Sequence, residues 1–141
     1  MNRRVVVTGM GLVTPLGIGV QDTWQALCAG KSGVGEITRF DTTKFQTKIA
    51  AEVKDFRAED FLPKKEAKRT ERFIAYAIAA TRMAMEDSGL VIDDTNAERV
   101  GVITGCGLGG LSILEDTCLT LTRKGPRRVS PFFIPMMIGN M

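Results

Sequence analysis

The stretch VGVITGCGLGG at Val100–Gly110 decides the predicted fold, because a short apolar run leads directly into a glycine-rich turn. Val100, Val102 and Ile103 predict a buried strand, since β-branched side chains suit a pleated surface and are stiff in helices. The glycines that follow allow the backbone to turn sharply and to approach a ligand closely. Leu108 is the one bulky side chain in this turn, and we expect it to face a ligand or to close its pocket.

The segments on either side of this turn predict alternating strands and helices. Strands are expected over Arg4–Thr8 and Lys48–Val53, and helices over Asp22–Ala29, from Pro63 to Gly89, over Leu111–Thr122 and from Ser130-Pro131 onward. Glycine, which favours helix C-termini, ends three of these helices, at Gly30, Gly89 and Gly125. This alternation is typical of an α/β fold with at least some parallel strand pairing.

The chain lacks histidine, and its three cysteines, Cys28, Cys106 and Cys118, are widely spaced. No Cys-His or Ser-His pair can therefore form within it, and neither a metal site nor a cofactor is predicted. We expect the cysteines to be small, buried, reduced residues. The apolar run near the N-terminus is too short for a signal peptide, and no segment approaches the ~20 apolar residues of a membrane span. These features predict a soluble cytoplasmic protein.

Positive charge is concentrated in two stretches, although the formal net charge is only +3. Lys64–Phe73 carries +3 and Arg123–Arg128 carries +4, so the remainder is acidic. Cations in the first turns of a helix oppose its dipole, and this arrangement favours an anionic partner over a purely structural role. Nucleic acid is disfavoured because no aromatic residues are interleaved with the basic ones. A small acidic protein or a phosphate-bearing ligand fits better, with a simply solvated helix face as the alternative.

The apolar end of the chain, SPFFIPMMIGNM at Ser130–Met141, contains no charged residue. Soluble domains seldom leave such apolar segments bare. We therefore expect later chain or a partner to cover it, and we expect residues 1–141 to be part of a longer protein.

The glycine turn also matches the dinucleotide-binding pattern G-x-G-x-x-G at Gly105–Gly110, after a predicted strand and before a predicted helix. The acidic residue expected about 20 positions later is missing. Arginines in that region could accommodate a phosphorylated ribose, so an NADP-binding module remains an alternative.

Taken together, the segments resemble the N-terminal part of the β-ketoacyl-[acyl-carrier-protein] synthases. The resemblance covers the whole chain and rests on ordered motifs: RRVVVTGMGLVTPLG at Arg3–Gly17, TWQALCAGKSG at Thr23–Gly33, FDTTKF at Phe40–Phe45, the KKEAKR helix, AMEDSGL at Ala84–Leu90, GCGLGGL at Gly105–Leu111 and GPRRVSPFFIP at Gly125–Pro135. It implies a thiolase-like fold of five α/β/α/β/α layers, with residues 1–141 as an incomplete N-terminal portion. Synthase II is the most similar type, while synthase I and polyketide-type ketosynthases remain open.

The resemblance implies an acyltransferase that performs a decarboxylative Claisen condensation in fatty-acid elongation. Malonyl-carrier protein loses CO₂, and the resulting carbanion attacks an acyl group held on a cysteine thiol. The family's nucleophilic cysteine and two histidines follow the point where this chain stops, so we expect no catalytic residue here and no condensation by this chain alone. The implied partners are acyl carrier protein, acyl and malonyl thioesters and a second copy in a homodimer.

The resemblance also assigns roles to individual positions. Leu108 corresponds to an aliphatic gate over the acyl pocket. Phe133 and Ile134 correspond to residues that cross the dimer interface and line the neighbouring acyl tunnel. The basic positions that would meet the acidic carrier protein are Lys65, Lys68, Arg69, Arg127 and Arg128.

Overall fold

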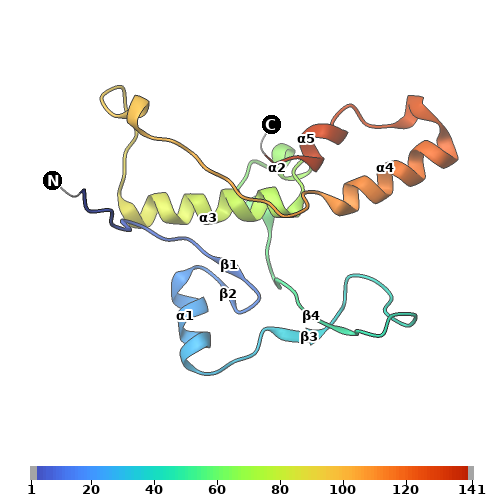
Figure 1. The fold of residues 1–141 in the computed structure, drawn as a ribbon, viewed down its shortest axis with the longest axis horizontal. Helices are drawn as coiled ribbons and strands as arrows, with labels where there is room; N and C mark the ends of the chain where they lie inside the picture. The colour runs from blue at the N-terminus through green and yellow to red at the C-terminus, as the bar shows by residue number, and fades with distance from the viewer. Residues whose placement is uncertain (1–2, 140–141) are drawn as a thin grey trace. The chain divides into compact units, whose positions relative to one another are not determined.

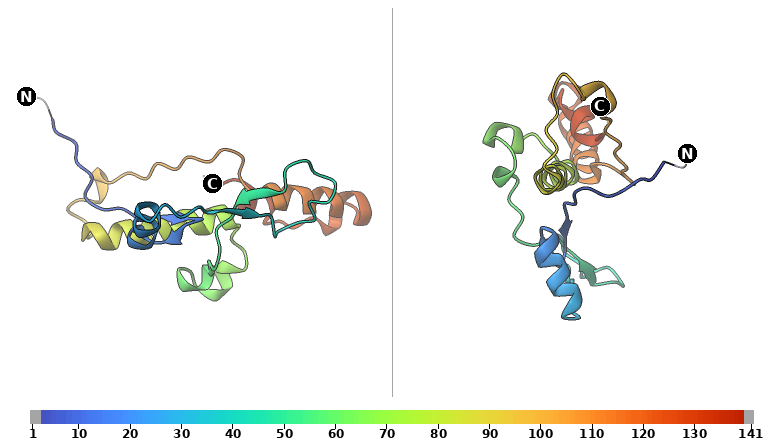
Figure 2. Two further views of the ribbon diagram at one scale, coloured as in Figure 1. Left: turned by 90° about the horizontal axis from the view of Figure 1, so that it is seen from below. Right: turned by 90° about the vertical axis from the view of Figure 1, so that its left-hand side faces the viewer.

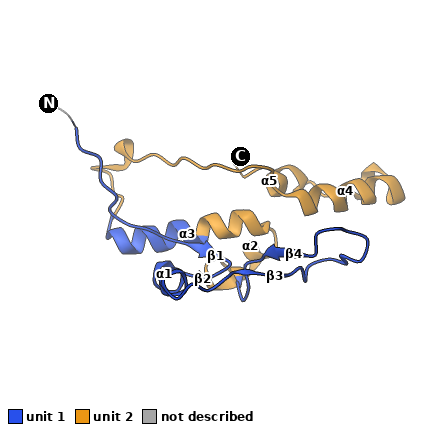
Figure 3. Cartoon of the chain, turned by 60° about the horizontal axis from the view of Figure 1, so that its bottom comes forward, with its two compact units in different colours: residues 1–57, 79–90 blue, residues 58–78, 91–141 orange. Residues whose placement is uncertain are grey.

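The computed structural model describes residues 3–139, which form two compact units (Figures 1 and 3). Unit 1 contains the chain up to Arg57 together with Ala79–Leu90, and unit 2 contains Ala58–Ile78 together with the chain from Val91 onward. The long helix α3, Arg72–Ser88, contributes residues to both units. Asn140 and Met141 of the predicted apolar end lie outside the described residues.

Unit 1 is built from two small antiparallel sheets and one short helix. Strands β1 (Val13–Thr14) and β2 (Gly17–Ile18) form a hairpin that leads into α1 (Val20–Cys28), and β3 (Val34–Glu36) pairs with β4 (Ile49–Ala51). The register aligns Val34 with Ala51 and Glu36 with Ile49. The predicted strand over Lys48–Val53 is thus confirmed in its central residues.

The segment before β1 crosses the second half of α3 at very close range. The backbone N–H of Met10 donates a 2.9 Å hydrogen bond to Oδ2 of Asp87. Gly11 lies directly against Ala80 and Ala84, which are spaced by one helical turn and share a face of α3. Glycine on one side and alanine on the other allow the two backbones to approach each other.

A buried hydroxyl joins the hairpin to α1. Thr23 is 4% exposed, and its hydroxyl lies 3.3 Å from the carbonyl of Gly17 and 3.1 Å from the hydroxyl of Thr14. Thr14 in turn accepts a hydrogen bond from the backbone N–H of Leu16. Every polar atom in this contact therefore has a partner, as buried polar atoms require.

We expect Thr23→Val to lower the free energy of unfolding by about 1–3 kcal/mol, because valine keeps the shape but leaves buried hydrogen-bonding groups unpaired. Denaturant titration of the protein measures the change. Thr47→Val, at an exposed threonine, is the matched control and is expected to be nearly neutral. Equal midpoints for the two variants would contradict a structural role of the Thr23 hydroxyl.

Unit 2 contains the remaining helices and irregular connections. Its elements are η1 (Ala58–Asp60), α2 (Lys64–Ala67), the first part of α3, η2 (Ala97–Arg99), α4 (Leu111–Lys124), η3 (Pro126–Arg128) and α5 (Phe133–Met137). Helix α4 packs against α5 (Figure 2). The predicted helix over Leu111–Thr122 is confirmed, and Gly125, with φ of 79°, follows its last residue as expected.

The single helix predicted from Pro63 to Gly89 is wrong, because the structure divides it into α2 and α3. The hydroxyl of Thr70 donates a 2.8 Å hydrogen bond to the carbonyl of Glu66, and the carboxylate of Glu71 accepts one of 2.8 Å from the N–H of Arg72. A carboxylate at the first N–H groups of α3 matches the positive end of its dipole, and it starts a new helix there. Gly89, with φ of 63°, ends α3 as predicted.

Two predicted strands and the predicted parallel pairing are absent from residues 3–139. Val5 is 95% exposed, and Ile103 is fully exposed at 100%. Both segments are rich in β-branched residues, but a strand also requires a neighbour that completes its ladder of hydrogen bonds. Neither Arg4–Thr8 nor Val100–Ile103 has such a neighbour within residues 3–139.

Other predicted details differ locally. In α1 the buried residues are Thr23 and Ala26, and Trp24 remains 64% exposed. Cys28, Cys106 and Cys118 are all exposed, so the prediction that they are buried is wrong. At the C-terminal end, Ser130 precedes the helix by three residues and accepts a hydrogen bond from Phe132 N–H, 3.2 Å away, within the preceding turn.

Candidate functional site

The basic residues predicted to dock a partner lie on the surface of unit 2. Lys65 belongs to α2, while Lys68 and Arg69 follow its last residue, and all three are exposed. The predicted conflict with the helix dipole is therefore wrong for Lys68 and Arg69. Since α2 ends at Ala67, Lys68 and Arg69 follow a helix C-terminus, where positive charge is favourable, whereas Lys65 is the second residue of this four-residue helix.

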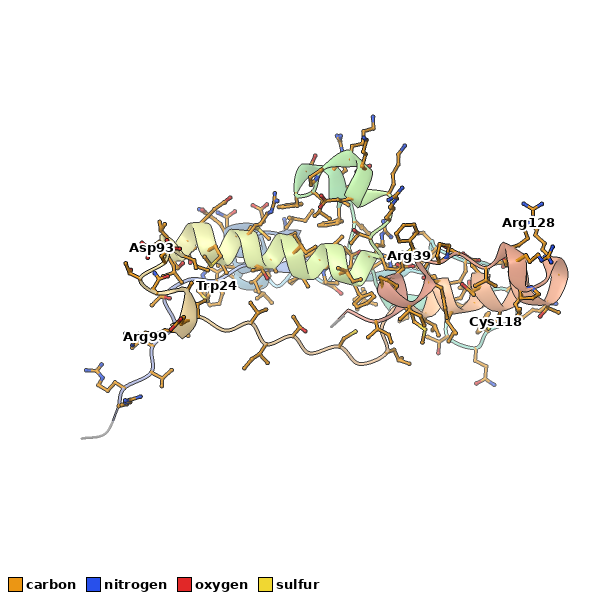
Figure 4. All side chains as sticks on the ribbon, turned by 90° about the horizontal axis from the view of Figure 1, so that it is seen from above. Trp24, Arg39, Asp93, Arg99, Cys118 and Arg128 are labelled. Atoms are coloured by element: carbon orange, nitrogen blue, oxygen red, sulfur yellow. The ribbon has the colours of Figure 1, made fainter. Side chains whose placement is uncertain are left out.

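The second basic stretch lies in the same unit. Arg127 and Arg128 form the end of η3 and are both exposed, and Arg128 points away from the ribbon (Figure 4). A surface hollow beside α4 is lined by Thr120, Lys124 and Arg128. Lys124 is the last residue of α4, where a cation compensates the exposed carbonyls of the helix end. The charge of Lys124 in this hollow is therefore explained by its place at the helix end.

An aromatic contact joins the two basic stretches. The guanidinium carbon of Arg69 lies 4.8 Å from the centroid of the Phe132 ring, within the range of a cation–π interaction. Arg69 comes from the turn between α2 and α3, and Phe132 comes from the turn that precedes α5. This contact brings residues more than sixty positions apart in sequence onto one surface of unit 2.

Sequence patterns alone do not identify Phe132 as part of this surface. It is one of two consecutive phenylalanines, and the predicted functional member of the pair is Phe133. The available signal is an aromatic residue four positions after Arg128, but nothing in the sequence pairs it with Arg69.

The glycine turn is closed on one side by the chain itself. Gly109 has φ of 74°, and the N–H of Gly110 donates a 2.9 Å hydrogen bond to the carbonyl of Met137. A Cβ atom on Gly109 would overlap that carbonyl oxygen, and one on Gly110 would lie 2.8 Å from the carbonyl oxygen of Met136. The requirement for glycine here comes from close packing against α5.

This packing disfavours the dinucleotide-binding alternative. The N–H of Gly110 already has a carbonyl partner, and two carbonyl oxygens face the end of the turn at which a pyrophosphate would bind. Phosphate oxygens and carbonyl oxygens are both acceptors and repel each other. The preceding segment is also not a strand, although the pattern requires one.

The residues predicted to contact an acyl chain lie in the glycine turn and on α5. Leu108 lies between Gly107 and Gly109 and is 78% exposed. Ile134 lies on α5 and is 42% exposed. Phe133 is partly buried on the same helix. The roles of these three residues in acyl binding stay predictions.

Other titratable groups in the described residues serve local turns. Hydrogen bonds from Thr43 and Thr95 hold the pKa of the carboxyl groups of Asp41 and Asp93 below their ordinary values. The hydroxyl of Thr38 likewise lowers the pKa of Glu52. Residues 3–139 contain no group of three or more acidic, cysteine or histidine side chains that could hold a metal ion. No helix among them is long and apolar enough to cross a bilayer.

Relatives of known name match nearly the entire chain. A 3-oxoacyl-[acyl-carrier-protein] synthase 2 of Synechocystis is 52% identical over 139 residues, which are 99% of this chain and 33% of the relative. Proteins of the same name from Coxiella burnetii and Vibrio cholerae are 54% and 51% identical, with 99% of this chain and 34% of each relative covered. The chain thus spans about one third of the length of these relatives.

Solved structures of ketosynthases share the fold. The ishigamide ketosynthase/chain length factor matches with a TM-score of 0.77 and 31% identity, over 98% of this chain and 34% of its own. A beta-ketoacyl synthase from Burkholderia phymatum gives 0.76 and 28%, over 97% and 34%. A type II polyketide ketosynthase in complex with its acyl-carrier protein gives 0.78 and 25%, over 97% and 35%.

These matches confirm the predicted fold class, an N-terminal part of a thiolase-like α/β fold. The family model described as "Beta-ketoacyl synthase, N-terminal domain" matches residues 2–141. With the ordered motifs, the fold and this match in agreement, the chain belongs to the beta-ketoacyl synthase family, as part of its N-terminal domain.

Proposed function

We propose that the chain is the N-terminal portion of a 3-oxoacyl-[acyl-carrier-protein] synthase, an acyltransferase that condenses malonyl units with an enzyme-bound acyl group in fatty-acid elongation. The observation that carries this proposal is sequence identity of 52% and 54% to synthases of that name along 99% of the chain. The complete enzyme performs the chemistry, and residues 1–141 alone are expected to be inactive.

In this proposal, the chain supplies the surface that receives the carrier protein. We define the docking surface as Lys65, Lys68, Arg69, Arg127 and Arg128, which are all exposed and all in unit 2. Carrier proteins are acidic, so complementary charge raises the association rate and orients the encounter. The printed title of one similar structure, a ketosynthase in complex with an acyl-carrier protein, supports this type of partner.

Leu108, Phe133 and Ile134 are the residues proposed to contact the acyl chain. Leu108 has glycine on both sides, so its side chain has room to change rotamer. Ile134 is an exposed aliphatic residue on α5, which suits a helix that contributes to an apolar interface. We further propose a homodimer in the cytoplasm, with Phe133 and Ile134 of α5 at the subunit contact.

A polyketide-type ketosynthase is the second candidate, and its support is the likeness to the ketosynthase of one type II polyketide system, beside that to the ishigamide ketosynthase/chain length factor. Identity to these structures is 25–31%, whereas identity to the 3-oxoacyl synthases is 51–54%. The fatty-acid function is therefore favoured.

Incubation of the full-length synthase with acyl- and malonyl-carrier protein tests the proposal. We expect one 3-oxoacyl-carrier-protein product, two carbons longer than the acyl primer, with release of one CO₂, as seen by intact-protein mass spectrometry. Several successive extensions without reduction of the keto group would instead support the polyketide candidate. Absence of condensation combined with NADPH binding would overturn both.

A further inference from the structure

The Arg69–Phe132 contact connects the two halves of the docking surface. Arg69 follows Lys65 and Lys68 in sequence, and Phe132 follows Arg127 and Arg128. The guanidinium carbon lies 4.8 Å from the ring centroid, and the backbone N–H of Arg69 donates a 2.8 Å hydrogen bond to the carbonyl of Glu66. The backbone at Arg69 and the head of its side chain are thus both held.

Restraint of an arginine matters because its long side chain otherwise loses rotamer freedom when it binds a partner. A cation–π contact holds the guanidinium without engaging a carboxylate, so its N–H groups can still donate to an acidic partner. Phe132 is itself 44% exposed, so the contact lies at the surface and does not seal Arg69 away from a partner.

We propose that Phe132 is a positioning residue, which orders the Arg69 guanidinium before an acidic side chain of the carrier protein binds. This inference rests on the proposed function and deepens it. The partner group is a carboxylate of the carrier protein, since the surface is basic and the guanidinium of Arg69 offers paired N–H donors. Phe132 acts through Arg69 and takes no part in the condensation itself.

Kinetics of the full-length synthase with Phe132→Leu and Phe132→Tyr test this role. We expect Phe132→Leu to raise KM for acyl-carrier protein by about two- to five-fold, the range that a surface cation–π contact corresponds to. The turnover number and KM for a small acyl thioester are expected to remain unchanged. Phe132→Tyr retains an aromatic face and is expected to keep KM near that of the wild type.

A double-mutant cycle separates this inference from the proposed function. In an Arg69→Ala background, Phe132→Leu is expected to have no further effect on KM, because the residue through which it acts is gone. If Phe132→Leu raises KM by the same factor in both backgrounds, or if Phe132→Tyr behaves like Phe132→Leu, positioning is overturned while docking stands. If Arg69→Ala and Lys65→Ala both leave KM for acyl-carrier protein unchanged, the docking role fails and the inference fails with it.

Discussion

Gly11→Ala is expected to destabilise the protein by about 2–3 kcal/mol, at the upper end of the range for overpacking of a tight interior. A Cβ atom at this position would overlap the carbonyl oxygen of Ala80 and lie 2.9 Å from the backbone nitrogen of Ala84. Both atoms belong to the backbone of α3, so no side-chain rotation can relieve the clash. The segment before β1 would have to move away from the helix.

Thermal unfolding of the full-length synthase measures this effect, with Gly35→Ala as the matched control. Gly35 lies in β3 of the same unit, and a Cβ atom there would meet only the flexible end of Lys54, 3.9 Å away. We expect a loss of several degrees in Tm for Gly11→Ala and almost none for Gly35→Ala. Equal Tm values for the two variants would show that the close approach to α3 is not needed.

Sequence patterns predict the helices of this chain well because local signals define them. Gly89 and Gly125 adopt positive φ after α3 and α4, as their position after apolar helical segments predicts. The break between α2 and α3 depends instead on side-chain bonds of Thr70 and Glu71. These residues are compatible with helix interiors, so the break has no composition signal.

Strands are predicted less well because they depend on distant neighbours. Val102 and Ile103 have the β-branched side chains of a strand, but they are 83% and 100% exposed, without a paired neighbour in residues 3–139. The short β3 and β4 strands form because their turn-rich connection brings Val34 opposite Ala51. Composition gives the tendency, and pairing determines whether the strand forms.

The docking surface is predicted only in part from the sequence. Clustered charge and the family resemblance both select Lys65, Lys68, Arg69, Arg127 and Arg128, and the structure shows them exposed in one unit. The helix-dipole argument is wrong for Lys68 and Arg69, since α2 ends before Lys68. Phe132 could not be predicted, because its contact with Arg69 depends on tertiary packing.

Charge reversal on the docking surface has the largest expected functional effect. In the full-length synthase, the double variant Lys65→Glu and Arg127→Glu is expected to raise KM for acyl-carrier protein by about tenfold at low salt, which corresponds to about 1.4 kcal/mol. Each substitution removes an attraction and adds a repulsion toward an acidic partner. The turnover number is expected to change little, since neither residue is assigned to the condensation.

The double variant Lys31→Glu and Lys44→Glu provides the matched control, because these exposed lysines lie in unit 1 and carry the same charge. If net charge alone governed the encounter, the control pair would raise KM as strongly as the docking pair.

Surface charges act over a screening length of about 10 Å at 0.1 M salt, so the docking effect should shrink as salt is added. KM for a small uncharged acyl thioester should be unaffected in all variants. An equal loss with both substrates would mean that Lys65 and Arg127 support the active site and do not dock the carrier.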